Sequence, residues 1–201
     1  MRINTSIADP RVMPDVRGFY ELEPTADIIK QFDPFIVPGF LQTPQAIHDS
    51  IVSTGTFTPG EGDVEFFTNI RLARQADFAE RFRLGHGPQI DVVLGQESYD
   101  LSKRYPGQTQ RLHDAHNATG GDLRANIRIL PTGKEVWLKT NGSFTIMEGK
   151  ATLPEVDRWA LLANLAFGHT VTTDNEDQVR DFKAIYATLR KAAVDLNDWQ
   201  K

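Results

Sequence analysis

The stretch QIDVVLGQ, residues 89–96, decides the fold class of this chain. Its apolar residues Ile90, Val92 and Val93 form a short run bounded by glycines, which is typical of a strand buried inside a sheet. The preceding residues, over about 63–84, are rich in good helix formers and predict one long helix. A buried strand that follows a long helix indicates a sheet with helices packed on it.

The same reading, carried outward from this strand, predicts the remaining elements. They are a strand-rich stretch at 19–36, a short helix at 44–54 that begins with Thr43 and Pro44, a helical pair between 96 and 120, an alternating strand in LRANIRIL at 123–130, a hairpin with a type I′ turn at Asn141-Gly142, a strand or strand pair at 158–172, and a helix over 176–194. We therefore expect an α+β fold, with a mostly antiparallel sheet of about five strands covered by helices. It should form a single domain over 19–201, preceded by an extended arm at 1–18.

Composition excludes several classes of protein. The 201 residues include no Cys, so disulfide frameworks, thiolate nucleophiles and Cys-based metal sites are excluded. The net charge is −5 and the basic residues are scattered, so we expect no direct nucleic-acid binding. No stretch is apolar for long enough to cross a membrane, and no secretion signal begins the chain, so we expect a cytoplasmic protein.

The predicted long helix contains NIRLARQADF, residues 69–78. At 100° per residue, Arg71 and Arg74 share a face of about 60° with Phe67 and Phe78. Two guanidinium groups beside aromatic rings fit the forked oxygens of a sulfate, phosphate or carboxylate, and Gln75 could add a neutral contact. The alternative is that both arginines reach water or pair with nearby acids, such as Asp77 or Glu80.

Acidic residues follow the buried strand in VVLGQESYD. Glu97, with Tyr99 and Asp100 close by, is placed where burial could tune a catalytic base. The alternative is that Glu97 caps the following helix. Asp91 could face solvent at a sheet edge.

Other polar clusters carry less information. Lys139 lies at the predicted hairpin tip and becomes a second anion contact if that tip folds over a pocket. His113 and His116 have helical spacing but lack a third ligand, so we expect a solvated helix face, no metal site and no cofactor.

Several stretches together resemble a known family, the actinobacterial effector domain DUF5753. They are YELEPTADIIKQFDPFIVPGFLQT, RLARQ, VVLGQES, IRILPTG and GSFTI. The resemblance spans about Phe19 to Ala193. It departs from the family at Gln96, where most members have an aspartate, and near Asn164, where an acidic residue is missing. Only about 18 residues precede the domain, so we expect no helix-turn-helix module in this chain.

A stand-alone domain of this kind resembles the larger subunit of the aziridine-forming proteins of azinomycin-type antibiotic biosynthesis. That resemblance implies an enzyme that works with a small partner protein and closes an aziridine ring, as an amine displaces a neighbouring sulfate ester. Arg71 and Arg74, with Lys139, would then stabilise the departing sulfate, and Glu97 or Asp100 would keep the amine unprotonated.

Two other functions stay open. The domain can be a regulatory module that senses a ligand or binds a partner without catalysis. It can also be a structural subunit whose arginines meet the acids of a partner across an interface.

Overall fold

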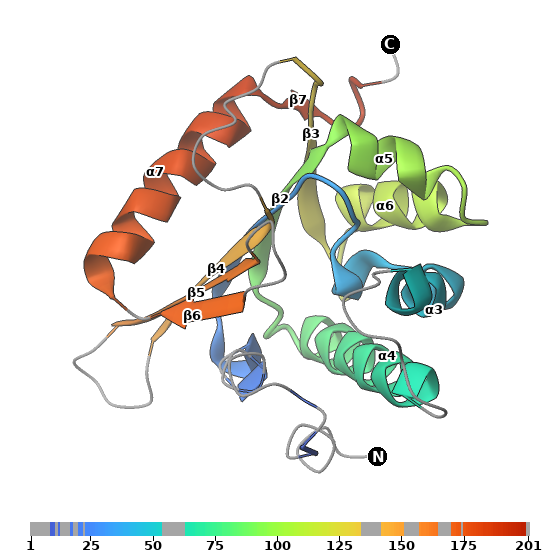
Figure 1. The fold of residues 1–201 in the computed structure, drawn as a ribbon, viewed down its shortest axis with the longest axis horizontal. Helices are drawn as coiled ribbons and strands as arrows, with labels where there is room; N and C mark the ends of the chain where they lie inside the picture. The colour runs from blue at the N-terminus through green and yellow to red at the C-terminus, as the bar shows by residue number, and fades with distance from the viewer. Residues whose placement is uncertain are drawn as a thin grey trace.

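A seven-stranded mixed sheet forms the centre of the molecule in the computed structural model (Figure 1). The structure describes residues 9–10, 12, 17, 20–21, 23–53, 63–133, 142–150, 157–164, 170–173 and 175–199. The strands are β1 (Ile28–Asp33), β2 (Gln89–Gly95), β3 (Ala125–Leu130), β4 (Phe144–Lys150), β5 (Asp157–Asn164), β6 (Thr170–Thr173) and β7 (Val194–Asp195). Their order across the sheet is β6-β5-β4-β1-β2-β3-β7. The pairs β1–β2 and β2–β3 are parallel and the other four are antiparallel, which confirms a mostly antiparallel α+β fold. The five longest strands match the expected number, and the short β6 and β7 extend the two edges.

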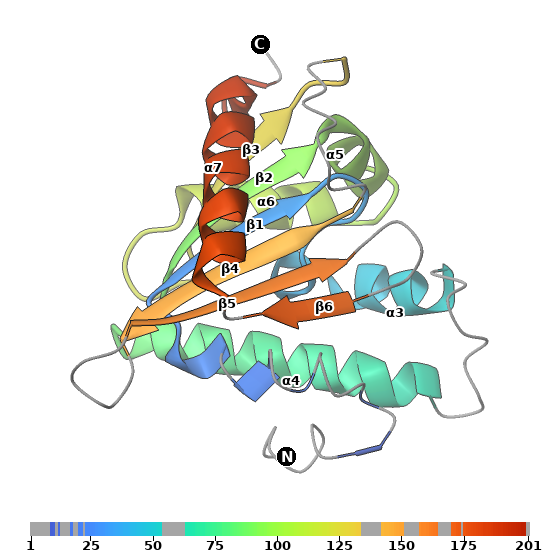
Figure 2. The same cartoon turned by 60° about the vertical axis from the view of Figure 1, so that its left-hand side comes forward.

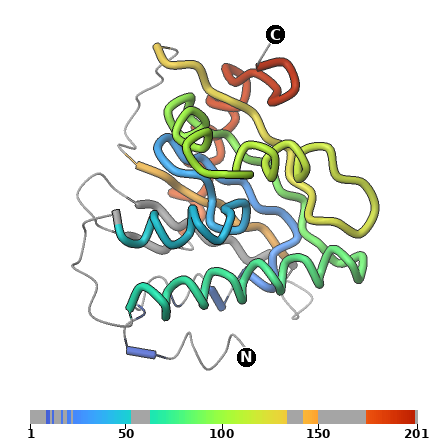
Figure 3. The backbone as a smooth tube through the Cα atoms, turned by 90° about the vertical axis from the view of Figure 1, so that its right-hand side faces the viewer, coloured from blue at the N-terminus to red at the C-terminus, as the bar shows by residue number. Residues whose placement is uncertain are grey.

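Helices cover both faces of the sheet. The 3-10 helices are η1 (Glu23–Thr25) and η2 (Gly39–Leu41), and the α-helices are α3 (Pro44–Ser53), α4 (Asp63–Arg83), α5 (Gln96–Ser102), α6 (Gln108–Asn117) and α7 (Glu176–Ala192). Figures 1 and 2 show α3, α4, α5 and α6 on one face and α7 alone on the other. Figure 3 shows α3 and α4 running alongside each other in front of the sheet.

Alternation along the strands divides the core into two parts. On β1, Ile29 packs toward α3–α6, whereas Phe32 packs toward α7. On β2, Val92 and Val93 make the same division, since neighbouring side chains of a strand point to opposite faces. The helix expected over 176–194 is present as α7, and an apolar stripe from this region packs in the second core: Val179, Phe182, Tyr186, Leu189 and Ala193. Both sides of the sheet are therefore apolar, as expected for a sheet covered on both faces.

Helix starts follow the local signals in the sequence. The Thr43 hydroxyl accepts the Ala46 N–H at 3.3 Å, and Pro44 is the first residue of α3, as predicted. Asn175 caps α7 by accepting the Gln178 N–H at 3.1 Å. The N–H of a first helical residue has no partner within the helix, so Pro44, which lacks this N–H, leaves no hydrogen bond unmade at the start of α3.

Two polar side chains lie in places that the sequence reading did not predict. Asp91 belongs to the central strand β2 and is buried, and the Arg190 Nε–H of α7 donates to it at 2.6 Å. The His116 side chain is only 9% exposed: its Nδ1 accepts the Ile127 N–H at 3.0 Å, and its Nε2 lies 3.1 Å from Asp195 of β7. The expectations of a solvated Asp91 and a solvated His116 were wrong, because both partners come from distant segments.

The predicted hairpin at Asn141-Gly142 falls partly on residues 134–141, which lie outside the described residues. The strand that follows this turn, β4, is described. Over Phe144–Glu148, β4 pairs with β1 on one edge and with β5 on the other. Both edges of this part of β4 are therefore paired within the described sheet. The predicted strand pair at 158–172 is present as β5 and β6.

Candidate functional site

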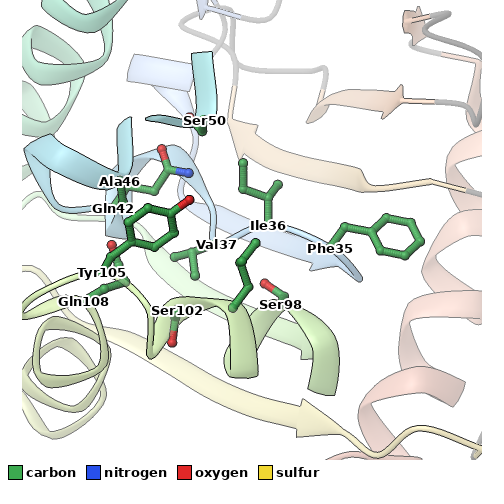
Figure 4. Close-up of a pocket in the computed structure, with 11 residues that line it drawn as sticks. Phe35, Ile36, Val37, Gln42, Ala46, Ser50, Ser98, Ser102, Tyr105 and Gln108 are labelled. Atoms are coloured by element: carbon green, nitrogen blue, oxygen red, sulfur yellow. The ribbon is translucent and has the colours of Figure 1, made fainter. Parts of the chain in front are cut away.

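A pocket of about 270 Å³ lies between the segments that leave the carboxyl ends of β1 and β2 (Figure 4). Much of its lining is apolar or aromatic: Phe35, Ile36, Val37, Ala46, Leu101 and Tyr105. Gly95 lets the two segments approach, since a Cβ there would lie 2.6 Å from the Pro34 carbonyl oxygen. The volume is near the lower end of the range for small-molecule sites, about 300–1,000 Å³.

One polar wall of the pocket is backed by Arg71 of α4. Its Nη1–H groups donate to Gln42 Oε1 at 3.3 Å and to Ser50 Oγ at 2.6 Å, and both of these residues line the pocket. Burial lowers the pKa of Arg71, and nearby Tyr20 and Asp33 oppose that effect. A guanidinium stays charged in proteins, so this wall carries a positive charge held by neutral oxygens.

The opposite wall belongs to α5 and the start of α6. Ser98 is fully buried, and its hydroxyl has no hydrogen-bond partner within the described residues. Ser102 differs, because its hydroxyl donates to the Tyr99 carbonyl oxygen at 2.6 Å. Buried hydroxyls are nearly always hydrogen-bonded, so the Ser98 hydroxyl has the chemistry of a ligand contact.

The segment Gly39–Thr43 between these walls is fastened by side chains from two helices. Gln75 of α4 donates to the carbonyl oxygens of Gly39 at 2.7 Å and Gln42 at 2.8 Å. Gln108 of α6 donates to the Leu41 carbonyl oxygen at 2.8 Å and accepts the Thr43 N–H at 2.7 Å. Arg111 adds a bond to Leu41 and one to the Gln75 side chain. We call this set the η2 clamp; its side chains are Gln75, Gln108 and Arg111.

Arg74 points to a different partner from Arg71. Its Nε–H and Nη2–H donate to the two carboxylate oxygens of Glu23 at 2.8 and 2.5 Å, and its guanidinium lies 4.2 Å from the centre of the Tyr20 ring. Burial by itself lowers the pKa of Arg74, but the Glu23 charge and Tyr20 outweigh burial and raise it. The acids considered from sequence do not pair with Arg74 in the described residues: Glu80 binds Arg83, and the partner of Arg74 is Glu23. The two arginines therefore serve separate sites.

A buried carboxyl group accompanies Arg71. Asp33 ends β1, is buried, and accepts a hydrogen bond from Gln31 Nε2 at 2.7 Å. Burial raises the pKa of Asp33 to about 7, and the lowering effects of Gln31, Arg71 and Ser143 are smaller. Sequence reading did not select Asp33, although an acid followed by proline at a strand end is a visible signal.

The other predicted site residues are spread over α5 and beyond. Glu97 and Asp100 are exposed, and Asp100 pairs with Lys103 at 2.7 Å, a hydrogen bond that lowers the pKa of Asp100. Tyr99 is fully buried in the core below α5. Lys139 lies outside the described residues. Neither Glu97 nor Asp100 is among the residues that line the pocket, because Ser98 and Ser102 occupy the pocket face of α5.

Two searches of the described ranges give negative results. No group of three or more His, Asp or Glu side chains there is placed to hold a metal ion. No helix in the same ranges has the length and apolar content needed to span a bilayer.

Comparison with known proteins gives one match. The model of a family described as "Domain of unknown function (DUF5753)" matches residues 16–198. The chain belongs to this family. No curated protein and no solved structure matches this chain.

Three of the five stretches that resemble DUF5753 meet around the pocket. PGFLQT, residues 38–43, is the segment held by the η2 clamp; RLARQ, residues 71–75, supplies Arg71 and Gln75. VVLGQES, residues 92–98, supplies the end of β2 and Ser98. Stretches far apart in the sequence of this DUF5753 domain therefore meet at one place.

Proposed function

We propose that this domain is a binding module for a small organic molecule, held in the pocket between η2, α3, α5 and α6. One observation carries the proposal: the fully buried Ser98 hydroxyl in the pocket wall has no partner within the described residues. A buried hydroxyl left unpaired costs about 1–3 kcal/mol, which a ligand that bonds to it would recover.

The construction of the walls supports the same function. Gln42 and Ser50 are held by Arg71, and the segment that carries Gln42 is fixed by the η2 clamp. Small-molecule sites in proteins are mostly apolar and largely formed in advance, with a few polar groups that orient the ligand. This pocket has that composition.

The aziridine-forming reaction stays a prediction, together with its small partner protein, its amine and sulfate ester substrate and a cytoplasmic location. The described residues add no observation that favours it. Glu97 and Asp100 lie on the exposed side of α5, and Arg74 is already matched by Glu23. The sensing or binding module is the function that the pocket supports best.

A screen of metabolites by thermal shift and ligand-observed NMR tests the binding function. The Ala46→Leu variant adds three carbon atoms to the pocket wall, and Ser98→Ala removes the unpaired hydroxyl. We expect compounds that stabilise the wild type to lose their effect in Ala46→Leu and to bind more weakly to Ser98→Ala. The matched control is Ala76→Leu on the exposed side of α4.

Compounds that bind Ala46→Leu and the wild type equally would place the ligand elsewhere. Circular dichroism of each variant separates a lost site from a lost fold.

A further inference from the structure

Within the part of the chain that the structure describes, no ion pair neutralises the charge of Arg71. The salt bridges of the described residues pair Arg74 with Glu23, but none includes Arg71. Among the described residues, the carboxyl group that acts on Arg71 electrostatically is that of Asp33, and burial raises the pKa of Asp33 to about 7. At neutral pH this acid is only partly ionised, so it offsets only part of the guanidinium charge.

The hydrogen-bonding groups left over in the pocket include donors. Arg71 occupies Gln42 Oε1, which orients the amide so that its Nε2–H₂ group is left to donate. That nitrogen donates no hydrogen bond within the described residues, and Figure 4 shows the Gln42 amide at the pocket. The Ser98 hydroxyl across the pocket adds a second available donor. None of the described residues that line the pocket is acidic.

From this arrangement we infer that the ligand is a small organic acid, with its carboxylate against the Gln42 amide and its apolar body against Val37, Ala46 and Leu101. Ser50 is not a donor to this ligand, because its hydroxyl donates to the Ile47 carbonyl oxygen at 2.8 Å. The inference rests on the proposed function and adds the class of ligand to it. Donors with a positive charge behind them select an anion over a neutral molecule of the same shape. The apolar lining and the volume of about 270 Å³ limit the body of that acid to a short aliphatic chain or a single ring.

A pair of probes that differ only in charge tests the inference. Octanoate and 1-octanol are titrated into the ¹⁵N-labelled protein at about pH 6, where Asp33 is mostly protonated and octanoate is still ionised, and the amide signals of Gln42, Ser50 and Ser98 report the site. We expect octanoate to bind at least about tenfold more tightly than 1-octanol, since a hydrogen bond to a charged group contributes about that much.

Two variants separate the charge from the shape of the pocket. Gln42→Glu places a carboxylate beside Arg71 with almost no change in volume, so octanoate binding should fall about tenfold or more while 1-octanol binding stays within about twofold. Arg71→Met should give the same pattern by removing the cation. Gln89→Glu, at the exposed amino end of β2, adds the same charge away from the pocket and should bind both probes as the wild type does.

The outcomes distinguish this inference from the function on which it rests. Equal binding of both probes, lost in Ala46→Leu, would overturn the inference and leave the pocket as a binding site for neutral molecules. If carboxylates and alcohols of six to ten carbons all fail to move the pocket signals, the inference is overturned together with the proposed function. An octanoate affinity unchanged in Gln42→Glu and Arg71→Met would also overturn it.

Discussion

Asp33 is a buried acid whose pKa lies far above its ordinary value. Burial raises its pKa to about 7, above the value of 3.8 that it has when exposed. The folded protein therefore holds this proton more tightly than the unfolded chain does. Between pH 4 and pH 7 the folded state binds more protons, so the contribution of Asp33 to the free energy of unfolding decreases as pH rises.

The first prediction concerns this residue. Asp33→Asn removes the titration, so it should abolish a loss of stability of at most about 4 kcal/mol between pH 4 and pH 8. Urea unfolding at both pH values, with the double difference between variant and wild type, measures the effect. Asp122→Asn, an exposed acid, serves as the control and should follow the wild-type curve. A double difference near zero for Asp33→Asn would show that folding does not raise the pKa of Asp33.

At the scale of elements, the η2 clamp replaces the hydrogen bonds that a regular strand or helix would provide. Within the described residues, the Leu41 and Gln42 carbonyl groups have no backbone partner, and side chains of α6 and α4 bond to them instead. Buried carbonyl groups require such partners. Gln75, for which the sequence suggested a ligand contact, instead donates to the backbone of this segment.

The second prediction tests the clamp. Gln75→Met leaves the Gly39 and Gln42 carbonyl oxygens without this donor, and should lower the free energy of unfolding by about 2–4 kcal/mol. Gln45→Met on α3, whose amide bonds only to Asp49 at the surface, should cost less than about 0.5 kcal/mol. Hydrogen exchange at the amide of Thr43 should accelerate in Gln75→Met alone. Equal costs for the two variants would contradict the clamp.

At the scale of the whole molecule, the central strands contribute to both cores. Phe144 of β4 packs against Phe32 and Phe182, with ring centres 5.7 and 5.0 Å away, on the α7 side. Met147 of the same strand packs toward α3–α6. Loss of either core removes support from strands that the other core needs, so the domain should unfold in one transition.

The third prediction follows from this sharing. Phe144→Ala should destabilise the protein by about 3–5 kcal/mol. In a urea series followed by hydrogen exchange and mass spectrometry, peptides from α6 and α7 should lose protection at the same urea concentration, in the variant as in the wild type. Earlier loss from α7 alone would mean that the two faces unfold independently.

Much of the fold could be predicted because its signals are local. The alternation in β3, the Thr43-Pro44 start of α3 and the apolar stripe of α7 each lie within one segment of chain. The site could be predicted only in part, since its contacts join distant segments. Glu23 binds Arg74 from 51 residues away, and Ser98 and Gln42 line the same pocket because β1 and β2 lie side by side. Sequence selected Arg71, yet its neutral partners and the unpaired Ser98 hydroxyl follow from packing.

The fastening of Gly39–Thr43 also bears on the thermodynamics of association. This segment is already held at several points by α4 and α6, so it should become little more ordered when a ligand binds. Binding should therefore cost little conformational entropy. A compound that fits should then dock onto a surface already shaped for it, with backbone shifts below about 1 Å between the empty and occupied forms.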